Sequence, residues 1–158
     1  MPSLFQYQVR PAVWINDEMA IANIRHEVFI TEQCVPESLE WETEDPAYEW
    51  FVAETRSGLI GIARLMLEPG EAQQVGRIGR IGRMAVRRPF RGKGVGRALL
   101  AAAIDSAREQ GLQAVKLSAQ THAVNFYVKY GFVAEGDIYM DAGIPHRTMR
   151  RILEEGRG

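Results

Sequence analysis

A glycine-rich turn that leads directly into a helix is the most constraining feature of this 158-residue chain. From Arg91 to Leu100 the segment reads Arg-Gly-Lys-Gly-Val-Gly-Arg-Ala-Leu-Leu. Glycine lets the backbone approach an anion closely, and the first N–H groups of a helix have no partner within the helix. Together with the positive end of the helix dipole, such groups bind anions. The segment therefore predicts a phosphate-binding loop.

Two familiar phosphate loops are excluded by the residues in this segment. A P-loop requires Ser or Thr directly after its lysine, whereas Gly94 follows Lys93. A dinucleotide-binding Rossmann unit requires the spacing G-x-G-x-x-G near an opening strand, with an acidic residue about twenty positions further on. Here Gly92, Gly94 and Gly96 alternate, far from the N-terminus. The loop is therefore of another type.

Length and composition favour one globular domain over residues 1–158. The chain is 46% hydrophobic and 25% charged, which is enough to form one core. The formal net charge of −1 gives no overall attraction to nucleic acid or membrane. The single cysteine, Cys34, cannot form an internal disulfide, and neither a signal peptide nor a membrane-spanning apolar run is recognisable. We therefore expect a cytoplasmic protein.

Hydrophobic periodicity and turn residues predict an α+β fold in which helices cover a mixed sheet. Leu100, Ala103, Ile104 and Ala107 lie on one helical face, and Gly111 can end that helix. Residues 37–47 are expected to form a loop or a short helical turn, and turns are expected at 56–58 and 69–70. Strands are expected over 4–10, 50–54, 59–67, 75–86, 114–118, 132–134 and 146–153, and helices over about 16–34, 95–110 and 121–130.

Two segments resemble the GNAT superfamily of N-acetyltransferases. Arg91, Gly94 and Gly96 match its pyrophosphate-loop pattern Gln/Arg-x-x-Gly-x-Gly/Ala, and residues 125–132 resemble its aromatic-Tyr-x-Lys-x-Gly-Phe signature. Residues 25–33 and 141–146 are similar to a bacterial subgroup of small, uncharacterised GNAT proteins. The resemblance implies a GNAT-type mixed central β-sheet with helices on both faces, splayed at the cofactor-binding strand.

The same resemblance implies acetyl-CoA, or coenzyme A, as co-substrate, with no metal. The loop would bind the pyrophosphate, and its cations, with Arg88, would neutralise charge. The backbone of residues 84–86 would pair with the pantetheine amides, and a strand N–H there would face the thioester oxygen. The residues implied to bind the cofactor are Met84, Ala85, Val86, Arg91, Gly92, Lys93, Gly94, Val95, Gly96, Arg97, Gln120 and Asn125.

Tyr127 matches the position of the general acid in the family. A tyrosine with a pKa of about 10 would protonate a thiolate whose acid has a pKa of about 8.5, at a cost of roughly 2 kcal/mol. We therefore expect Tyr127 to protonate the departing thiolate. The alternative role for Tyr127 is that of an aromatic core residue beside Phe126 and Tyr130.

The base that deprotonates the amine is not evident in the sequence. GNAT enzymes often place a glutamate on the long strand before the loop, but here that strand carries Arg77, Arg80 and Arg83. The candidates are Glu32, the acids from Glu40 to Asp45, and His146, and we expect Glu32 and His146 to contact the acceptor. Residues 37–54 carry carboxylates and no Lys or Arg, which suggests a cationic acceptor.

We therefore expect an acetyl-CoA-dependent N-acetyltransferase that moves acetyl directly to a primary amine of a small molecule or peptide. Cys34 would not be a covalent carrier. The resemblance is also compatible with a homodimer, and we expect neither a nucleic-acid nor a membrane partner. A non-catalytic CoA-binding or regulatory module is one alternative. A nucleic-acid stripe over residues 77–83 is another, although strand alternation places its arginines on both faces.

Overall fold

The computed structural model describes residues 5–35, 48–67 and 77–153. The chain divides into two compact units. Unit 1 comprises Met1–Arg64 and Arg83–Ala103, and unit 2 comprises Leu65–Gly82 and Ile104–Gly158. That residues 1–158 form a single domain remains a prediction. Among the described residues, no helix is long and apolar enough to cross a membrane.

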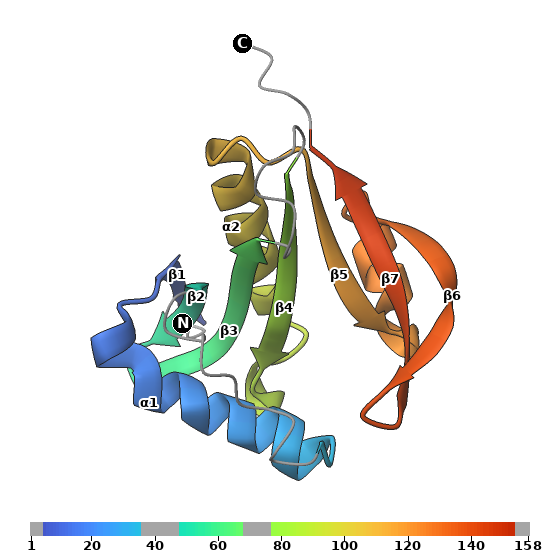
Figure 1. The fold of residues 1–158 in the computed structure, drawn as a ribbon. Coiled ribbons are helices and arrows are strands. Elements are labelled where there is room, and N and C mark those ends of the chain that lie inside the picture. The colour runs from blue at the N-terminus through green and yellow to red at the C-terminus, as the bar shows by residue number, and fades with distance from the viewer. Residues whose placement is uncertain (1–4, 36–47, 68–76, 154–158) are drawn as a thin grey trace. The chain divides into compact units, whose positions relative to one another are not determined.

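The described chain contains both strands and helices, and Figure 1 labels them. The strands are β1 (Gln8–Pro11), β2 (Glu49–Thr55), β3 (Gly58–Leu67), β4 (Ile78–Val86), β5 (Ala114–Gln120), β6 (Val133–Asp141) and β7 (Ile144–Ile152). The α-helices are α1 (Trp14–Arg25), α2 (Val95–Glu109) and α3 (Val124–Val128), with the π-helix η1 (His26–Glu32) and the 3-10 helices η4 (Arg88–Phe90) and η5 (Thr121–Ala123).

The strands form one mixed sheet in the order β1-β2-β3-β4-β5-β7-β6. β4 and β5 are parallel, and Ile78–Arg80 pairs with Ala114–Lys116. β5 pairs with β7, and β7 with β6, in antiparallel fashion. The expectation of a mixed sheet is confirmed. β4 and β5 pair over these three residues, and both strands continue beyond the paired part, β4 to Val86 and β5 to Gln120.

In unit 1, helices cover both faces of the sheet. Ile62 on β3 packs with Ile21 and Ile24 of α1 in a buried cluster. Its neighbour Gly61 faces the opposite way, because successive strand residues alternate, and lies against Val95 and Leu99 of α2. The expected helices on both faces are therefore present in this unit.

In unit 2, the two faces of the three-stranded segment β5-β7-β6 differ. Val115, Leu117 and Met149 are buried on one face. The side chain of Arg151, on that same face of β7, donates from Nη1 to the carbonyl of Tyr130, two residues after α3. The opposite face carries the half-buried polar residues Lys116, Ser118, Glu135, Tyr139, Thr148 and Arg150, with the buried His146. We call this set the polar face.

The first helix differs from the expectation at both ends. It begins at Trp14, before Asn16 and Asp17, and the Asp17 carboxylate accepts a hydrogen bond from the backbone N–H of Val13. It continues as the π-helix η1, in which Gln33 N–H bonds to the carbonyl of Val28, five residues back. A π turn was not expected, because its side-chain periodicity differs little from that of an α-helix over so few residues.

The hairpin turn at 56–58, the helix from Val95 and the strand from Ala114 are confirmed. Gly111 has φ +77, as a helix C-cap requires. The strand expected at 132–134 was too short, since β6 extends to Asp141. β6 is an edge strand with an irregular register between Glu135 and Tyr139, and this irregularity hides its alternation in the sequence. The expectations for Leu4, 37–47, 69–70 and the start of the 75–86 strand fall outside the described residues.

We expect Gly61→Ala to destabilise the protein by about 1–3 kcal/mol, because overpacking a core costs that much. A Cβ at this position would lie 2.9 Å from Leu99 Cδ1 and 3.2 Å from the carbonyl oxygen of Ala85. Urea unfolding measures the change, and Ser57→Ala in the exposed hairpin turn is the control. Equal stability of Gly61→Ala and wild type would show that α2 does not approach β3 this closely.

Candidate functional site

The backbone of the glycine-rich loop has the conformation that an anion site requires. Gly92 and Gly94 have φ +77 and +87, in the left-handed region where a larger side chain is strained. The carbonyl of Gly94 accepts the hydrogen bond from Ala98 N–H, which starts α2. In the described chain, no hydrogen bond outside the helix uses the N–H groups of residues 95–97. These N–H groups are therefore available to a ligand.

Arg91 fixes the entrance to this loop. Its Nε donates to the carbonyl of Val86 at 2.7 Å, which closes the turn after β4. Its two terminal nitrogens donate to the two carboxylate oxygens of Glu32 at 2.7 and 2.8 Å. A bidentate pair of this kind holds both side chains in one geometry. Arg91 therefore connects β4, the loop and η1.

Glu32 is an ion-pair partner in this structure. Besides Arg91, it contacts Arg88 Nη2 at 3.3 Å. The hydrogen bond from Arg91 is the main cause that lowers the pKa of the Glu32 carboxyl, and the positive charge of both arginines lowers it further. A carboxylate stabilised in this way is a weaker proton acceptor than a free one. Sequence reasoning placed Glu32 near an acceptor, and the structure brings it to Arg91.

The other cations of the loop are exposed. Arg88, Lys93 and Arg97 lie on the surface of unit 1. Lys93 Nζ lies 5.4 Å from the ring centroid of Phe5, at cation–π distance. Arg88 lies next to the loop with a side chain that is 73% exposed. These charges can neutralise an anion without first breaking a buried contact.

The segment before β1 packs against the loop, which the sequence did not indicate. Tyr7 donates from its hydroxyl to the carbonyl of Gly94 at 3.3 Å. The ring of Phe5 stacks on Phe90 of η4 at 5.9 Å between centroids. These contacts join positions more than eighty residues apart, and no local sequence pattern reports them. Both contacts hold the loop from the N-terminal side.

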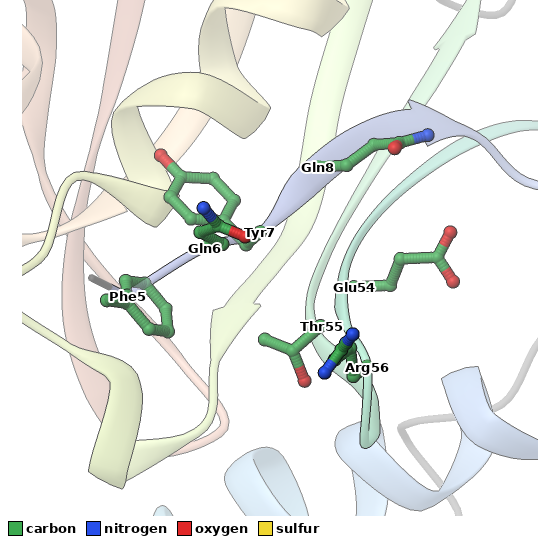
Figure 2. A pocket seen from close by; sticks show the side chains of 7 residues that line it. All are labelled: Phe5, Gln6, Tyr7, Gln8, Glu54, Thr55 and Arg56. Carbon is green, nitrogen blue, oxygen red and sulfur yellow. The ribbon is translucent and has the colours of Figure 1, made fainter. Parts of the chain in front are cut away.

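A groove of about 580 Å³ lies beside this segment in unit 1. Figure 2 shows the residues before and within β1 on one side and those of the β2–β3 hairpin on the other. Phe5 and Tyr7, which also contact the loop, line the groove. None of the residues expected at the cofactor or acceptor site lines it. The lining residues are Phe5, Gln6, Tyr7, Gln8, Glu54, Thr55 and Arg56.

β4 contains an irregularity directly before the residues expected to bind a cofactor arm. Arg83 has φ +50, which is uncommon for a residue with a side chain and changes the local course of a strand. Ala85 is buried, whereas Met84 and Val86 are half-buried. The carbonyl of Val86 is used by Arg91. The bulge expected in this strand therefore has a local counterpart at Arg83.

Tyr127 lies on α3 in unit 2, within an aromatic cluster. Its ring makes edge contacts with Phe126 at 5.0 Å and Phe132 at 5.9 Å between centroids. Removal from water raises the pKa of the Tyr127 phenol to about 12. The hydroxyl therefore keeps its proton at neutral pH and is a weaker acid than a solvated phenol.

The remaining expected residues also belong to unit 2. Gln120 ends β5 and accepts a hydrogen bond at 2.7 Å from Nε2 of His122, and Asn125 is exposed on α3. His146 lies opposite Gln120 in the β5–β7 register. In unit 1 the structure brings Glu32 to the loop of residues 91–97. The acids from Glu40 to Asp45 lie outside the described residues.

No group of three or more metal-ligating side chains occurs within residues 5–35, 48–67 and 77–153.

The structure also brings together Ser118 and Tyr139, whose hydroxyls are hydrogen-bonded, although sequence reasoning did not select either residue. Only the strand register places them side by side, since they are 21 positions apart.

Comparisons of sequence and of structure with known proteins lead to the same family. The family description "Acetyltransferase (GNAT) domain" matches residues 13–153. The uncharacterised N-acetyltransferase YjcF of Bacillus subtilis is 33% identical over 129 residues, which cover 81% of this chain and 87% of YjcF. An acyl-CoA N-acyltransferase from Pseudomonas aeruginosa has a similar structure, with a TM-score of 0.73 at 29% identity over 92% of this chain and 98% of that one.

The fold is shared more widely. The N-acetylglutamate synthase of Neisseria gonorrhoeae, solved with coenzyme A and N-acetylglutamate, has a TM-score of 0.72 at 20% identity. The match covers 97% of this chain and 36% of that chain. The fold expected from the sequence resemblance is thereby confirmed.

Glu32→Gln should destabilise the protein at neutral pH and have less effect in acid. The folded-state pKa of Glu32 is lowered, so its contribution is present above the ordinary carboxyl pKa and is lost as the pH falls through the folded-state pKa. We expect a loss of about 0.5–1 kcal/mol near pH 7, because Arg91 is partly exposed. Urea unfolding at neutral and at acidic pH measures this loss of stability, and Glu18→Gln on the exposed face of α1 is the control. A loss that does not depend on pH would argue against the ion pair.

The raised pKa of the Tyr127 phenol can be observed by absorbance. The difference in tyrosinate absorbance between wild type and Tyr127→Phe should titrate near pH 12, since burial disfavours the charged form. Circular dichroism at each pH shows whether the protein remains folded. A difference that titrates near the ordinary tyrosine pKa of 10.0 would mean that Tyr127 is solvated.

Proposed function

Because the chain belongs to the GNAT acetyltransferase family, we propose that it is an acetyl-CoA-dependent N-acetyltransferase that transfers the acetyl group directly to a primary amine. The acceptor is a small molecule or a peptide. The observation that carries the proposal is the loop of residues 91–97, whose backbone has the conformation for binding a pyrophosphate.

Coenzyme A binds through this loop in our proposal. The N–H groups of Val95, Gly96 and Arg97 donate to the pyrophosphate oxygens, and Lys93 supplies positive charge close by. The hydrogen bonds from Arg91 to Glu32 and to the carbonyl of Val86 keep these donors in place before the ligand binds. Preorganisation of this kind avoids the cost of ordering a loop on binding. The coenzyme A seen with the gonococcal synthase supports the same ligand here.

The end of β4 provides the second part of the proposed binding site. Backbone groups of Met84, Ala85 and Val86 pair with the pantetheine amides as a strand would. A positive φ at Arg83 supports this, because an irregular residue in a strand redirects the N–H and carbonyl groups that follow it. An N–H near Val86 stabilises the developing oxyanion of the thioester carbonyl. Gln120 and Asn125 contact the cofactor arm.

Tyr127 is the proposed general acid. With a pKa of about 12 for the phenol, full transfer of its proton to a thiolate costs roughly 5 kcal/mol, more than the sequence alone suggested. We infer that the phenol protonates the thiolate while it accepts a proton from the acylated nitrogen, so that tyrosinate does not accumulate. The aromatic contacts around Tyr127 support this role because they hold its ring in place, and its phenol carries a proton at neutral pH.

A non-catalytic CoA-binding module is the second candidate. One observation favours it: the described residues of β4, Ile78–Val86, include no carboxylate that could act as a base. Such a module would bind coenzyme A through the same loop and acylate no amine. Acyl transfer to any amine separates the two candidates.

Two substitutions at Gly94 test the cofactor site. Asp and Asn have the same size and both tolerate a left-handed φ, and a Cβ at this position meets Arg97 and Tyr7 only at ordinary contact distances. We expect Gly94→Asp to weaken coenzyme A binding at least about tenfold, because it places a negative charge beside the pyrophosphate. Gly94→Asn should bind within about threefold of wild type.

Calorimetric titration of coenzyme A into the wild type and the two variants, all checked for folding, measures the effect. Equal affinity of the Asp and Asn variants would show that the pyrophosphate does not bind at this loop. An absence of binding by the wild type would contradict the proposal as a whole.

A further inference from the structure

The polar face of unit 2 contains a hydrogen-bonded cluster at the end of β5. The hydroxyls of Ser118 on β5 and Tyr139 on β6 are hydrogen-bonded to each other. The ring of Tyr139 stacks on that of His146 on β7, with 6.0 Å between centroids and an interplanar angle of 24°. The strand register explains the arrangement, since His146 lies opposite both Gln120 and Tyr139. The three side chains therefore come from three adjacent strands.

One nitrogen of His146 is fixed as the proton-bearing one. Nδ1 lies 2.7 Å from the carbonyl oxygen of Ile144, and a carbonyl oxygen can only accept. Nδ1 therefore carries the hydrogen in the neutral ring, and Nε2 carries a lone pair. Among the described residues, none pairs with Nε2, and Nε2 is not among the buried atoms that lack a partner. Nε2 is therefore the ring nitrogen that can accept a proton.

The ring of His146 is held in a rigid setting. His146 is 8% exposed, and its ring is fixed on one side by Tyr139 and at Nδ1 by the backbone. Tyr139 is held in turn by Ser118. A histidine whose ring is oriented by a second group is prepared for proton transfer at its other nitrogen.

Building on the proposed function, we infer that His146 is the general base of the reaction and takes a proton from the acceptor amine at Nε2. η5 and α3, which carries Tyr127, follow directly after Gln120, and β7 contacts η5. The base and the proposed acid therefore adjoin the same end of β5 from opposite faces, His146 on the polar face and α3 on the face where Arg151 contacts Tyr130. This assignment supplies the proton acceptor that β4 lacks among its described residues.

The protons balance over one turnover. Nε2 of His146 takes one proton from the ammonium form of the acceptor and later releases it to solvent. The freed amine forms the N–C bond to the thioester carbonyl, and the C–S bond breaks as coenzyme A leaves with its electron pair. The second proton from nitrogen passes through the Tyr127 hydroxyl to the thiolate. The products are the amide, the free thiol and one proton.

Other titratable groups lie on the polar face or next to it. Tyr139 and Glu135 come from β6, Lys116 from β5, Arg150 from β7 and His122 from η5. Glu135 is paired with Lys116 at 3.7 Å and with Arg150 at 3.1 Å. Asp141 on β6, in register with Ile144, is a further carboxylate on the same face as Tyr139.

The test compares acyl transfer by wild type, His146→Gln and His26→Gln against a panel of primary amines with acetyl-CoA. Gln is close to His in size but cannot take a proton, and His26 is exposed in unit 1 and outside the proposed machinery. For His146→Gln we expect kcat near neutral pH to fall about 10²-fold or more, with unchanged KM for acetyl-CoA. Its rate should recover as the pH approaches the pKa of the amine, because a free amine needs no base. His26→Gln should behave as wild type.

Two control measurements separate catalysis from structure. Imidazole nitrogen shifts of the wild type should show hydrogen on Nδ1 of neutral His146, and added imidazole should partly restore the activity of His146→Ala. Hydrogen on Nε2, or a wild-type pH profile in His146→Gln, would overturn this inference and leave the proposed function intact. Absence of transfer by the wild type to every amine would contradict both.

Discussion

The proposed phosphate site depends on the hydrogen bonds that the guanidinium of Arg91 donates. One side chain closes the turn after β4 through the carbonyl of Val86 and joins it to η1 through both oxygens of Glu32. η1, which is distant in sequence, is thereby fixed to the loop that leads from β4 into α2. Arginine rather than lysine is required here, because only a planar guanidinium can donate in these directions at once. The backbone donors of the loop are then left for the ligand.

Much of the fold was evident from the sequence because its signals are local. The glycine loop followed by an amphipathic stretch predicted α2 from Val95, and the turn at 56–58 predicted the β2–β3 hairpin. The resemblance carried by Arg91, Gly94 and Gly96 identified the family correctly. In each case the responsible residues are close together in the chain, so that a pattern of a few positions is sufficient.

What the sequence did not reveal depends on distant contacts. Arg91 was expected to face phosphate, but it pairs with Glu32, 59 positions away. The same is true of Tyr7 and Gly94, which only the folded chain brings together. His146 was one of several candidate bases, and only the Ile144 carbonyl and the ring of Tyr139 distinguish it from the others. Strand register and side-chain burial determine such roles, and a local sequence motif reports neither of them.

The central claim is direct acetyl transfer from acetyl-CoA to an amine, and mass spectrometry of a single turnover tests it most directly. The account predicts one acetylated amine for each coenzyme A released, with the protein itself unmodified. An acetyl group on Cys34, which is exposed, would contradict direct transfer. Bound acetyl-CoA that remains intact with every amine offered would contradict the enzyme and favour a coenzyme A-binding module.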